Sequence, residues 1–219
     1  MINVKRYPPP ANYNVKVKNK GQKFLNSNPN PTASEFKRHA YWKEIHKYMH
    51  NSYSGICAYC ASWTPKNSMS NTDHTSIDHF IPKSKLPSMA YEWDNFRLCR
   101  IKLNVNKSDS LDVMDPLFIR NGWFIIDFTS FLIRPSSEEP AWIQGQVNAS
   151  INRLQLNVNE YVNERRRIIF MYACDRITLV NVKERYPFIA SEIQRQDFDK
   201  NYKIRIRTYC RKHALGIKP

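Results

Sequence analysis

Glycine is scarce in this sequence of 219 residues: there are five, and none stands before a Lys-Ser or Lys-Thr pair. A nucleotide-binding P-loop needs that pattern, so the chain has none, and any ATP chemistry would belong to a partner. Long apolar runs are also lacking. None has the length of a membrane span, and the first residues lack the hydrophobic segment of a secretory signal. These absences predict a soluble, cytoplasmic protein without a membrane attachment.

Acidic residues are outnumbered by basic ones, 19 to 34, which gives a net charge of +15. This imbalance predicts a polyanionic partner, bound with an affinity that falls steeply with salt. The charge does not distinguish DNA from RNA, and a generally basic protein is the plain alternative. Residues 1–32 precede the first acidic residue, Glu35, and form a basic arm. The arm either lies on nucleic acid or a partner, or wraps its own domain.

The stretch from residue 75 to residue 109 predicts two strands followed by a helix. Thr75 to Ile81 is rich in β-branched residues and stops at Pro82, which is typical of a short strand. Asn95 to Cys99 predicts a second strand. Arg100 to Lys107 contains no Gly or Pro and predicts a helix that ends at the polar turn after it. The order is that of a ββα unit.

Polar residues of this unit suit phosphodiester hydrolysis. His79 is the natural base for activating water, because imidazole titrates near neutral pH. Asp78 and Asn104 offer hard oxygen ligands for Mg²⁺ or Mn²⁺. Lys107 shares a helix face with Asn104 and is expected to steady the transition-state charge or to bind the phosphate backbone. Three further cations are candidate phosphate contacts from position and charge: Lys83, Arg97 and Arg100.

This pattern resembles the Asp-His…Asn…Asn-x-x-Lys form of the HNH (ββα-metal) endonucleases. The resemblance implies an α+β fold with an HNH nuclease core. It implies His79 as general base, Asp78 and Asn104 as metal ligands, and Asn95 as a brace for the loop that carries the base. Further segments resemble the standalone HNH proteins of retron-associated and Septu-type anti-phage systems, namely Cys-Ala-Tyr-Cys, Ile-Asp-His-Phe-Ile-Pro-Lys-Ser and Tyr-Glu-Trp-Asp-Asn. There the HNH protein works beside a partner ATPase.

The cysteines depart from the family pattern of two Cys-x-x-Cys pairs that bind Zn²⁺. Cys57 and Cys60 form the first pair, Cys99 is half of the second, and Lys102 stands where the fourth ligand belongs. Two alternatives stay open. A distant histidine completes a structural zinc site, or the zinc is gone and the cysteines are small buried hydrophobes. An odd number of cysteines, five, favours a reducing compartment over a disulfide framework.

Outside this unit the sequence predicts helices and one hairpin. Ser34 is expected to cap a helix that runs to about Asn51. Asn121-Gly122 lies between two apolar runs, Leu117–Arg120 and Trp123–Phe128, which predicts a β-hairpin. Two long helices are expected later, from Asn159 to about Val180 and from Pro187 to about Leu215. In the Arg165–Arg167 run at least one side chain should make an internal pair, because the three span nearly a full turn.

We therefore predict an α+β protein in three parts: a basic arm (1–32), an HNH domain with an N-terminal helix and a following hairpin (33–134), and a helical C-terminal region packed on it (135–219). The predicted function is metal-dependent cleavage of nucleic acid, most simply DNA, as a defence nuclease. One such site cuts one strand, so double-strand cleavage requires a homo-oligomer or two successive binding events. The alternatives are a restriction- or mobile-element-type HNH nuclease, and a non-catalytic basic subunit that binds nucleic acid.

Overall fold

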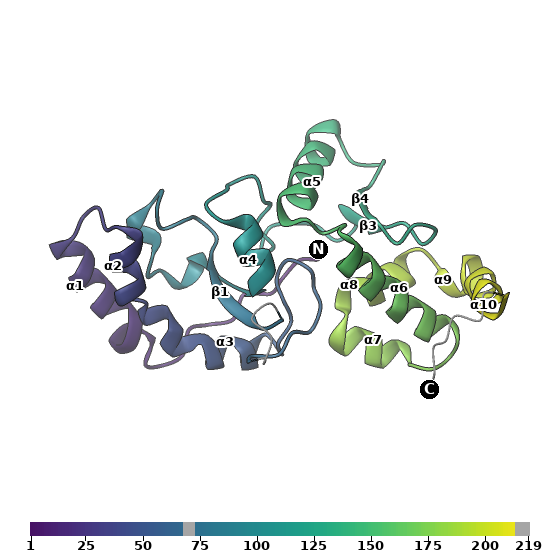
Figure 1. Ribbon diagram of the computed structural model, residues 1–219, viewed down its shortest axis with the longest axis horizontal. Helices are drawn as coiled ribbons and strands as arrows, with labels where there is room; N and C mark the ends of the chain where they lie inside the picture. The colour runs from purple at the N-terminus through teal and green to yellow at the C-terminus, as the bar shows by residue number, and fades with distance from the viewer. Residues whose placement is uncertain (68–72, 213–219) are drawn as a thin grey trace.

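The computed structural model describes residues 1–67 and 73–212 of the chain, which is an α+β protein. Its described strands form two small antiparallel sheets, β1–β2 and β3–β4, each of two strands. The molecule is elongated (Figure 1). The helices at one end are α1 (Asn19–Ser27) and α2 (Ala33–Arg38), and those at the other end are α9 (Phe198–Asn201) and α10 (Lys203–Lys212). No helix in these described ranges is long and apolar enough to cross a membrane.

Strands β1 (Thr75–His79) and β2 (Phe96–Arg100) pair antiparallel, with Asp78 opposite Arg97, and helix α4 (Ile101–Lys107) follows at once. The three elements confirm the strand, strand and helix predicted for this stretch. Because β2 leads into α4 without a loop, the helix folds back against β1. This return brings residues nearly thirty positions apart in the chain into contact, as with Asn104 and Ser76.

The β1–β2 sheet lies between two hydrophobic cores. Side chains of a strand alternate between its faces, and β2 shows this directly: Leu98 belongs to the N-terminal core and Cys99 to the C-terminal core. The N-terminal core also holds Phe36 and Trp42, while the other core holds Leu103 of α4 together with the C-terminal helices. The sheet is thus packed on both faces, and α4 is anchored in the C-terminal core.

The basic arm packs on its own chain. A short helical turn, η1 (Asn14–Lys18), and α1 bury Val17 and Phe24 in the N-terminal core, and the Tyr13 hydroxyl donates to the Tyr91 carbonyl. Residues 1–32 therefore wrap their own domain, and a contact of this arm with nucleic acid or a partner stays a prediction.

The helix expected from Ser34 to Asn51 is divided, which corrects that prediction. Thr32, not Ser34, caps α2, because its side chain and that of Glu35 form a capping box. A 3₁₀ turn, η2 (Tyr41–Ile45), and α3 (His46–Ser52) follow as separate pieces. Two further 3₁₀ turns, η3 (Pro87–Met89) and η4 (Trp93–Asn95), lie between β1 and β2.

The predicted Asn121-Gly122 hairpin is wrong. The hairpin that forms joins β3 (Phe124–Ile126) to β4 (Ile133–Pro135), and residues 117–120 are not a strand. The amide of Asn3 instead donates to the carbonyls of Leu117 and Ile119, at 3.0 Å each. A segment more than a hundred residues away in the chain therefore takes the backbone groups that a partner strand would have used.

The C-terminal half is helical, as predicted, but its helices are shorter. They are α5 (Ala141–Leu154), α6 (Asn159–Ala173), α7 (Leu179–Arg185) and α8 (Pro187–Arg195), followed by α9 and α10. The first long helix ends early because Thr178 caps a new one, and the second breaks at Asp197, which has φ of 49°. The predicted end near Leu215 lies outside the described residues.

Arg165 is internal, as expected of one arginine in the Arg165–Arg167 run, and donates to the carbonyls of Phe131 and Leu156.

Candidate active site

The candidate base and both candidate ligands line one cavity of about 480 Å³. Asp78 and His79 come from the end of β1, and Asn104 comes from α4. The cavity wall also includes Trp42 and Lys83. The antiparallel register and the immediate turn from β2 into α4 explain this convergence, because they place the end of β1 against the face of α4 that carries Asn104.

His79 is fixed in one orientation. Its Nε2–H donates to the Ala90 carbonyl at 2.9 Å, so in the neutral ring Nδ1 carries the lone pair. The rings of Trp42 and Phe96 meet the imidazole edge to face, with centroids 4.6 and 5.3 Å away. Burial, together with the Lys83 ammonium, lowers the pKa of His79 to about 3. The ring is therefore neutral at physiological pH and can accept a proton at Nδ1.

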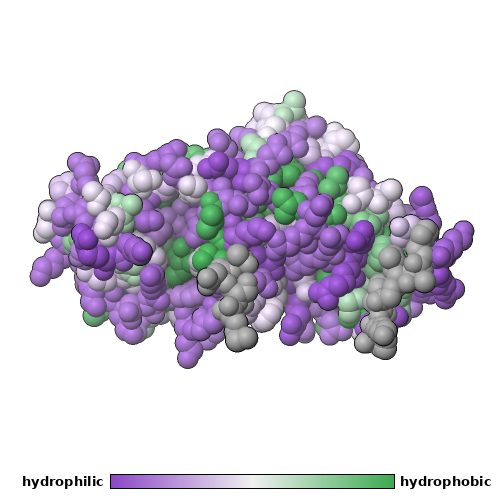
Figure 2. Space-filling view, viewed as in Figure 1, coloured by the Kyte–Doolittle hydropathy of each residue, from purple (hydrophilic) through white to green (hydrophobic). Residues whose placement is uncertain are grey.

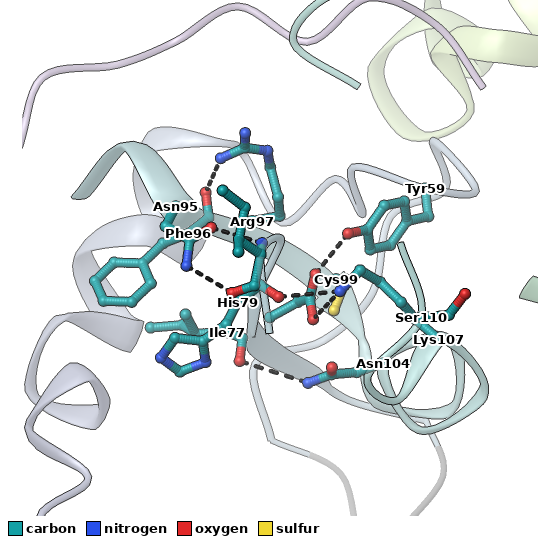
Figure 3. Close-up of polar contacts among 12 residues, drawn as sticks. Tyr59, Ile77, His79, Asn95, Phe96, Arg97, Cys99, Asn104, Lys107 and Ser110 are labelled. Carbon is teal, nitrogen blue, oxygen red and sulfur yellow. Dashed lines mark hydrogen bonds and ion pairs between the residues drawn. The ribbon is translucent and has the colours of Figure 1, made fainter. Parts of the chain in front are cut away.

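Asp78 is held by two donors from distant segments. The Tyr59 hydroxyl donates to Oδ2 at 2.5 Å, and the Lys107 ammonium approaches Oδ1 at 3.2 Å. In Figure 3 the side chains of Tyr59 and Lys107 point toward the same place, and both contact this carboxylate. The carboxyl is 3% exposed, and its burial raises the pKa against the opposing effect of Lys107. A carboxylate has about four lone-pair sites, so two donors leave it further capacity as a ligand.

Asn104 is oriented through its amide nitrogen. Nδ2 donates to Ser76 Oγ at 3.0 Å and lies 3.5 Å from the Ile77 carbonyl, the contact drawn in Figure 3. Among the described residues no donor bonds its Oδ1. Together with the carboxylate of Asp78, this amide oxygen makes a hard donor set that fits Mg²⁺ or Mn²⁺. Two protein ligands leave most positions on such an ion for water and a phosphate.

Asn95 makes the contacts of a brace. Its Oδ1 accepts from the Ile81 amide at 2.7 Å, and its Nδ2 donates to the carbonyls of Ile81 and Met89 at 2.9 and 3.0 Å. The side chain is 2% exposed. These three hydrogen bonds join the loop directly after His79 to the segment that supplies the Ala90 carbonyl. Asn95 therefore holds in place both the backbone next to His79 and the segment that its imidazole bonds.

Three of the predicted phosphate contacts are internal. Lys107 is fully buried and bonds Asp78 and the His79 carbonyl. Arg97 forms a two-point pair with Asp115, and Arg100 pairs with Glu164 and Asp73. Their charges are compensated inside the protein. This corrects the predicted phosphate contacts of Lys107, Arg97 and Arg100, which are structural cations here. The alternative role of Lys107, to steady the transition-state charge, stays a prediction.

Lys83 retains the placement expected of a phosphate contact. It lines the cavity, and its ammonium lies 5.5 Å from the centre of the Trp42 ring and 5.9 Å from that of Phe36. Burial lowers its pKa, and the Asp78 carboxylate opposes that shift. Within residues 1–67 and 73–212, Lys83 is therefore the cation that lines the same cavity as the candidate base.

Of the three predicted zinc ligands, Cys57 and Cys99 belong to the C-terminal core, and Cys60 packs against it. Cys57 Sγ accepts from the Arg100 amide at 3.2 Å, and Cys99 Sγ lies 3.6 Å from Ser76 Oγ. A hydrogen bond with Cys57, together with burial, raises the pKa of the Cys60 thiol. In the described ranges no three His, Cys, Asp or Glu side chains are grouped to hold a metal ion. The structural zinc stays a prediction.

Three residues of the site were not assigned from the sequence. Trp42 contacts the imidazole, Tyr59 holds Asp78, and Asp109 lines the cavity as a further oxygen donor. For Trp42 the sequence contains no signal, because its contact depends on how η2 packs against β1. Tyr59 lies between the two cysteines of Cys-Ala-Tyr-Cys, and a polar aromatic residue at full burial requires a partner.

Comparison with known proteins adds no assignment: no family model and no curated protein matches the chain.

Proposed function

We propose that the chain is a metal-dependent HNH endonuclease that hydrolyses phosphodiester bonds in nucleic acid, most simply DNA. The observation that carries the proposal is that His79, Asp78 and Asn104 line one cavity, while Nε2 of the imidazole donates a hydrogen bond to the Ala90 carbonyl. The order of β1, β2 and α4 agrees with a ββα-metal core. The hydrophilic side chains on most of the face in Figure 2 and the net charge of +15 suit a polyanionic substrate.

Each residue has a role in the proposed reaction. His79 takes a proton from the attacking water at Nδ1, and its Nε2 hydrogen bond to the Ala90 carbonyl leaves the Nδ1 lone pair as the acceptor. Lys83 binds a phosphate oxygen. Asn95 holds the loop that carries the base, and Lys107 and Tyr59 hold the carboxylate of Asp78. These last three are positioning residues, because they act through His79 and Asp78.

Asp78 and Asn104 would hold the Mg²⁺ or Mn²⁺ ion. When bound, such an ion stabilises negative charge on the phosphate and on the leaving oxygen. The predicted ion has few protein ligands, so its affinity depends on how firmly the two oxygens are presented. Tyr59, Lys107 and Ser76 provide that support through the hydrogen bonds described above.

The test is a plasmid-nicking assay in Mg²⁺ or Mn²⁺ with wild type and two histidine variants. His79→Ala should lower the rate by about 10²- to 10⁴-fold, as expected for loss of a general base. His50→Ala is the matched control, because His50 also donates from Nε2 to a carbonyl, that of Thr64 at 3.0 Å, but does not line the cavity. Cleavage by His79→Ala at the wild-type rate would disprove the assignment.

The biological setting rests on the resemblance to standalone HNH proteins of anti-phage systems. On that basis we propose a nuclease effector that acts beside a partner ATPase. Reproducible cutting of one DNA sequence by the purified chain alone would instead favour a restriction- or mobile-element-type enzyme. Salt-dependent binding of DNA without any metal-stimulated cleavage would identify a non-catalytic nucleic-acid-binding subunit.

A further inference from the structure

A second cavity, of about 410 Å³, lies in the C-terminal region. It is formed by the loop between β3 and β4, by α6 and by the segment from Tyr202 into α10, at the end of the molecule away from α1 and α2 (Figure 1). Aromatic rings make much of its wall, among them Phe131, Phe170 and Tyr209. Its cationic lining residues are Arg166 of α6 and Arg205 of α10.

The two arginines face this cavity without compensation. Both are exposed, neither forms an ion pair or hydrogen bond within residues 1–67 and 73–212, and no acidic residue of that part lines the cavity. Other cations of α10 differ: Lys203 pairs with Asp175 at 2.9 Å, and Arg207 pairs with the same carboxylate. The fold thus pairs Lys203 and Arg207 with a carboxylate, whereas it places Arg166 and Arg205, from separate helices, at one cavity without such a partner in the described part of the chain. An anionic ligand would relieve their repulsion.

The loop at this cavity is held in a strained conformation. Phe131 has φ of 62°, in the left-handed region that a bulky residue rarely adopts. Its carbonyl accepts from Arg165 Nε at 2.8 Å, and the Asp127 carboxylate accepts from the Thr129 amide at 2.8 Å. The position keeps an aromatic residue where glycine would fit without strain. That residue packs edge to face on Phe170 and forms part of the cavity wall, and strain of this kind is concentrated at ligand sites.

We propose that this cavity binds one nucleotide of a single-stranded nucleic acid, with the base against the aromatic wall and an adjoining phosphate between Arg166 and Arg205. Aromatic faces accept any base, and arginine pairs with phosphate oxygens through two parallel hydrogen bonds. We assign the cavity to a strand and not to a free nucleotide because the substrate of the proposed nuclease, on which this assignment rests, is a polynucleotide. The cavity would then hold the substrate at a distance from the β1–α4 cavity.

The test measures binding without cleavage, by fluorescence anisotropy of labelled oligothymidylate in EDTA. Arg166→Gln and Arg205→Gln should each weaken binding and lower the slope of log K against log salt by about 0.7. Arg167→Gln is the matched control, because it removes the same charge from the same helix but does not line the cavity. Wild type should prefer oligothymidylate over an abasic strand of equal length by roughly tenfold, and Tyr209→Ala should remove most of that preference.

Two results would overturn the proposal: losses for Arg166→Gln and Arg205→Gln no larger than for Arg167→Gln, or equal affinity of wild type for the abasic strand. Thymidine monophosphate is also tested as a competitor of the labelled strand. If it competes as well per nucleotide as the unlabelled strand does, the cavity binds a free nucleotide and the proposal is overturned. Because no metal is present, these outcomes are separate from those of the nicking assay. His79→Ala should bind the strand as wild type does.

Discussion

The hydroxyl of Tyr59 donates to Oδ2 of Asp78 over 2.5 Å, and neither residue is open to solvent, with exposures of 0% and 3%. Tyr59 lies in the turn between Cys57 and Cys60, while Asp78 is in β1. The contact therefore joins the cysteine turn to the residue we propose as a metal ligand. It also fixes the carboxylate plane that Lys107 approaches from α4.

Tyr59→Phe should weaken the site while keeping the packing of the ring. The variant leaves Oδ2 of Asp78 without its donor, which should lower the free energy of unfolding by about 1–3 kcal/mol. The Mn²⁺ concentration for half-maximal nicking should rise, because the carboxylate is presented less firmly. Urea unfolding and a metal titration measure the two effects. An unchanged metal requirement together with lower stability would show that Tyr59 is only a packing residue.

Lys107→Met tests the buried ion pair. Removing one partner of a buried pair leaves the other charge uncompensated and typically costs about 3–5 kcal/mol. Lys102→Met is the control on the same helix, since Lys102 pairs with Glu160 near the surface and such pairs contribute about 0–1 kcal/mol. Combining Lys107→Met with Asp78→Asn should recover part of the lost stability in urea unfolding. A double variant as unstable as the sum of the singles would contradict the pairing.

The elements around the site were predictable because their signals are local. The β-branched run before Pro82 and the Gly- and Pro-free stretch after Arg100 each determine their own structure. Once two neighbouring strands pair and a helix follows directly, the positions of His79 and Asn104 are largely determined. The brace formed by Asn95 follows from the same geometry, because Asn95 directly precedes β2 and bonds the loop after β1.

The failures came from partners that are distant in the sequence. Asn3 occupies the backbone of the expected strand at Leu117–Arg120. Arg97 and Arg100 were candidate phosphate contacts, yet Asp115 and Glu164 compensate their charges inside the protein. A buried cation and an exposed one look alike in a sequence, because burial depends on which carboxylate the fold brings near.

Asn95→Ala should lower both stability and activity. The change leaves the Ile81 amide without its acceptor and removes the two donors to Ile81 and Met89. The expected cost is about 1–3 kcal/mol in the free energy of unfolding, with a fall in nicking rate at saturating metal, because the loop after His79 loosens. Asn106→Ala is the control, since Asn106 makes one hydrogen bond, to the Leu154 carbonyl on α5. Equal nicking rates for the two variants would count against a bracing role.

His46 provides a test of stability against pH. Its Nε2 lies 2.9 Å from Thr75 Oγ1, and burial, with further effects of Lys66, His50 and His74, lowers its pKa from 6.5 to about 4. Between these values the unfolded chain binds the proton and the folded chain does not. The contribution of neutral His46 to the free energy of unfolding is therefore fully present above pH 6.5. It is lost as the pH falls toward about 4. Wild type should lose more unfolding free energy across this range than His46→Gln, in urea unfolding at a series of pH values. His79 contributes equally to both proteins, so identical pH dependence would mean that His46 is not held neutral by the fold.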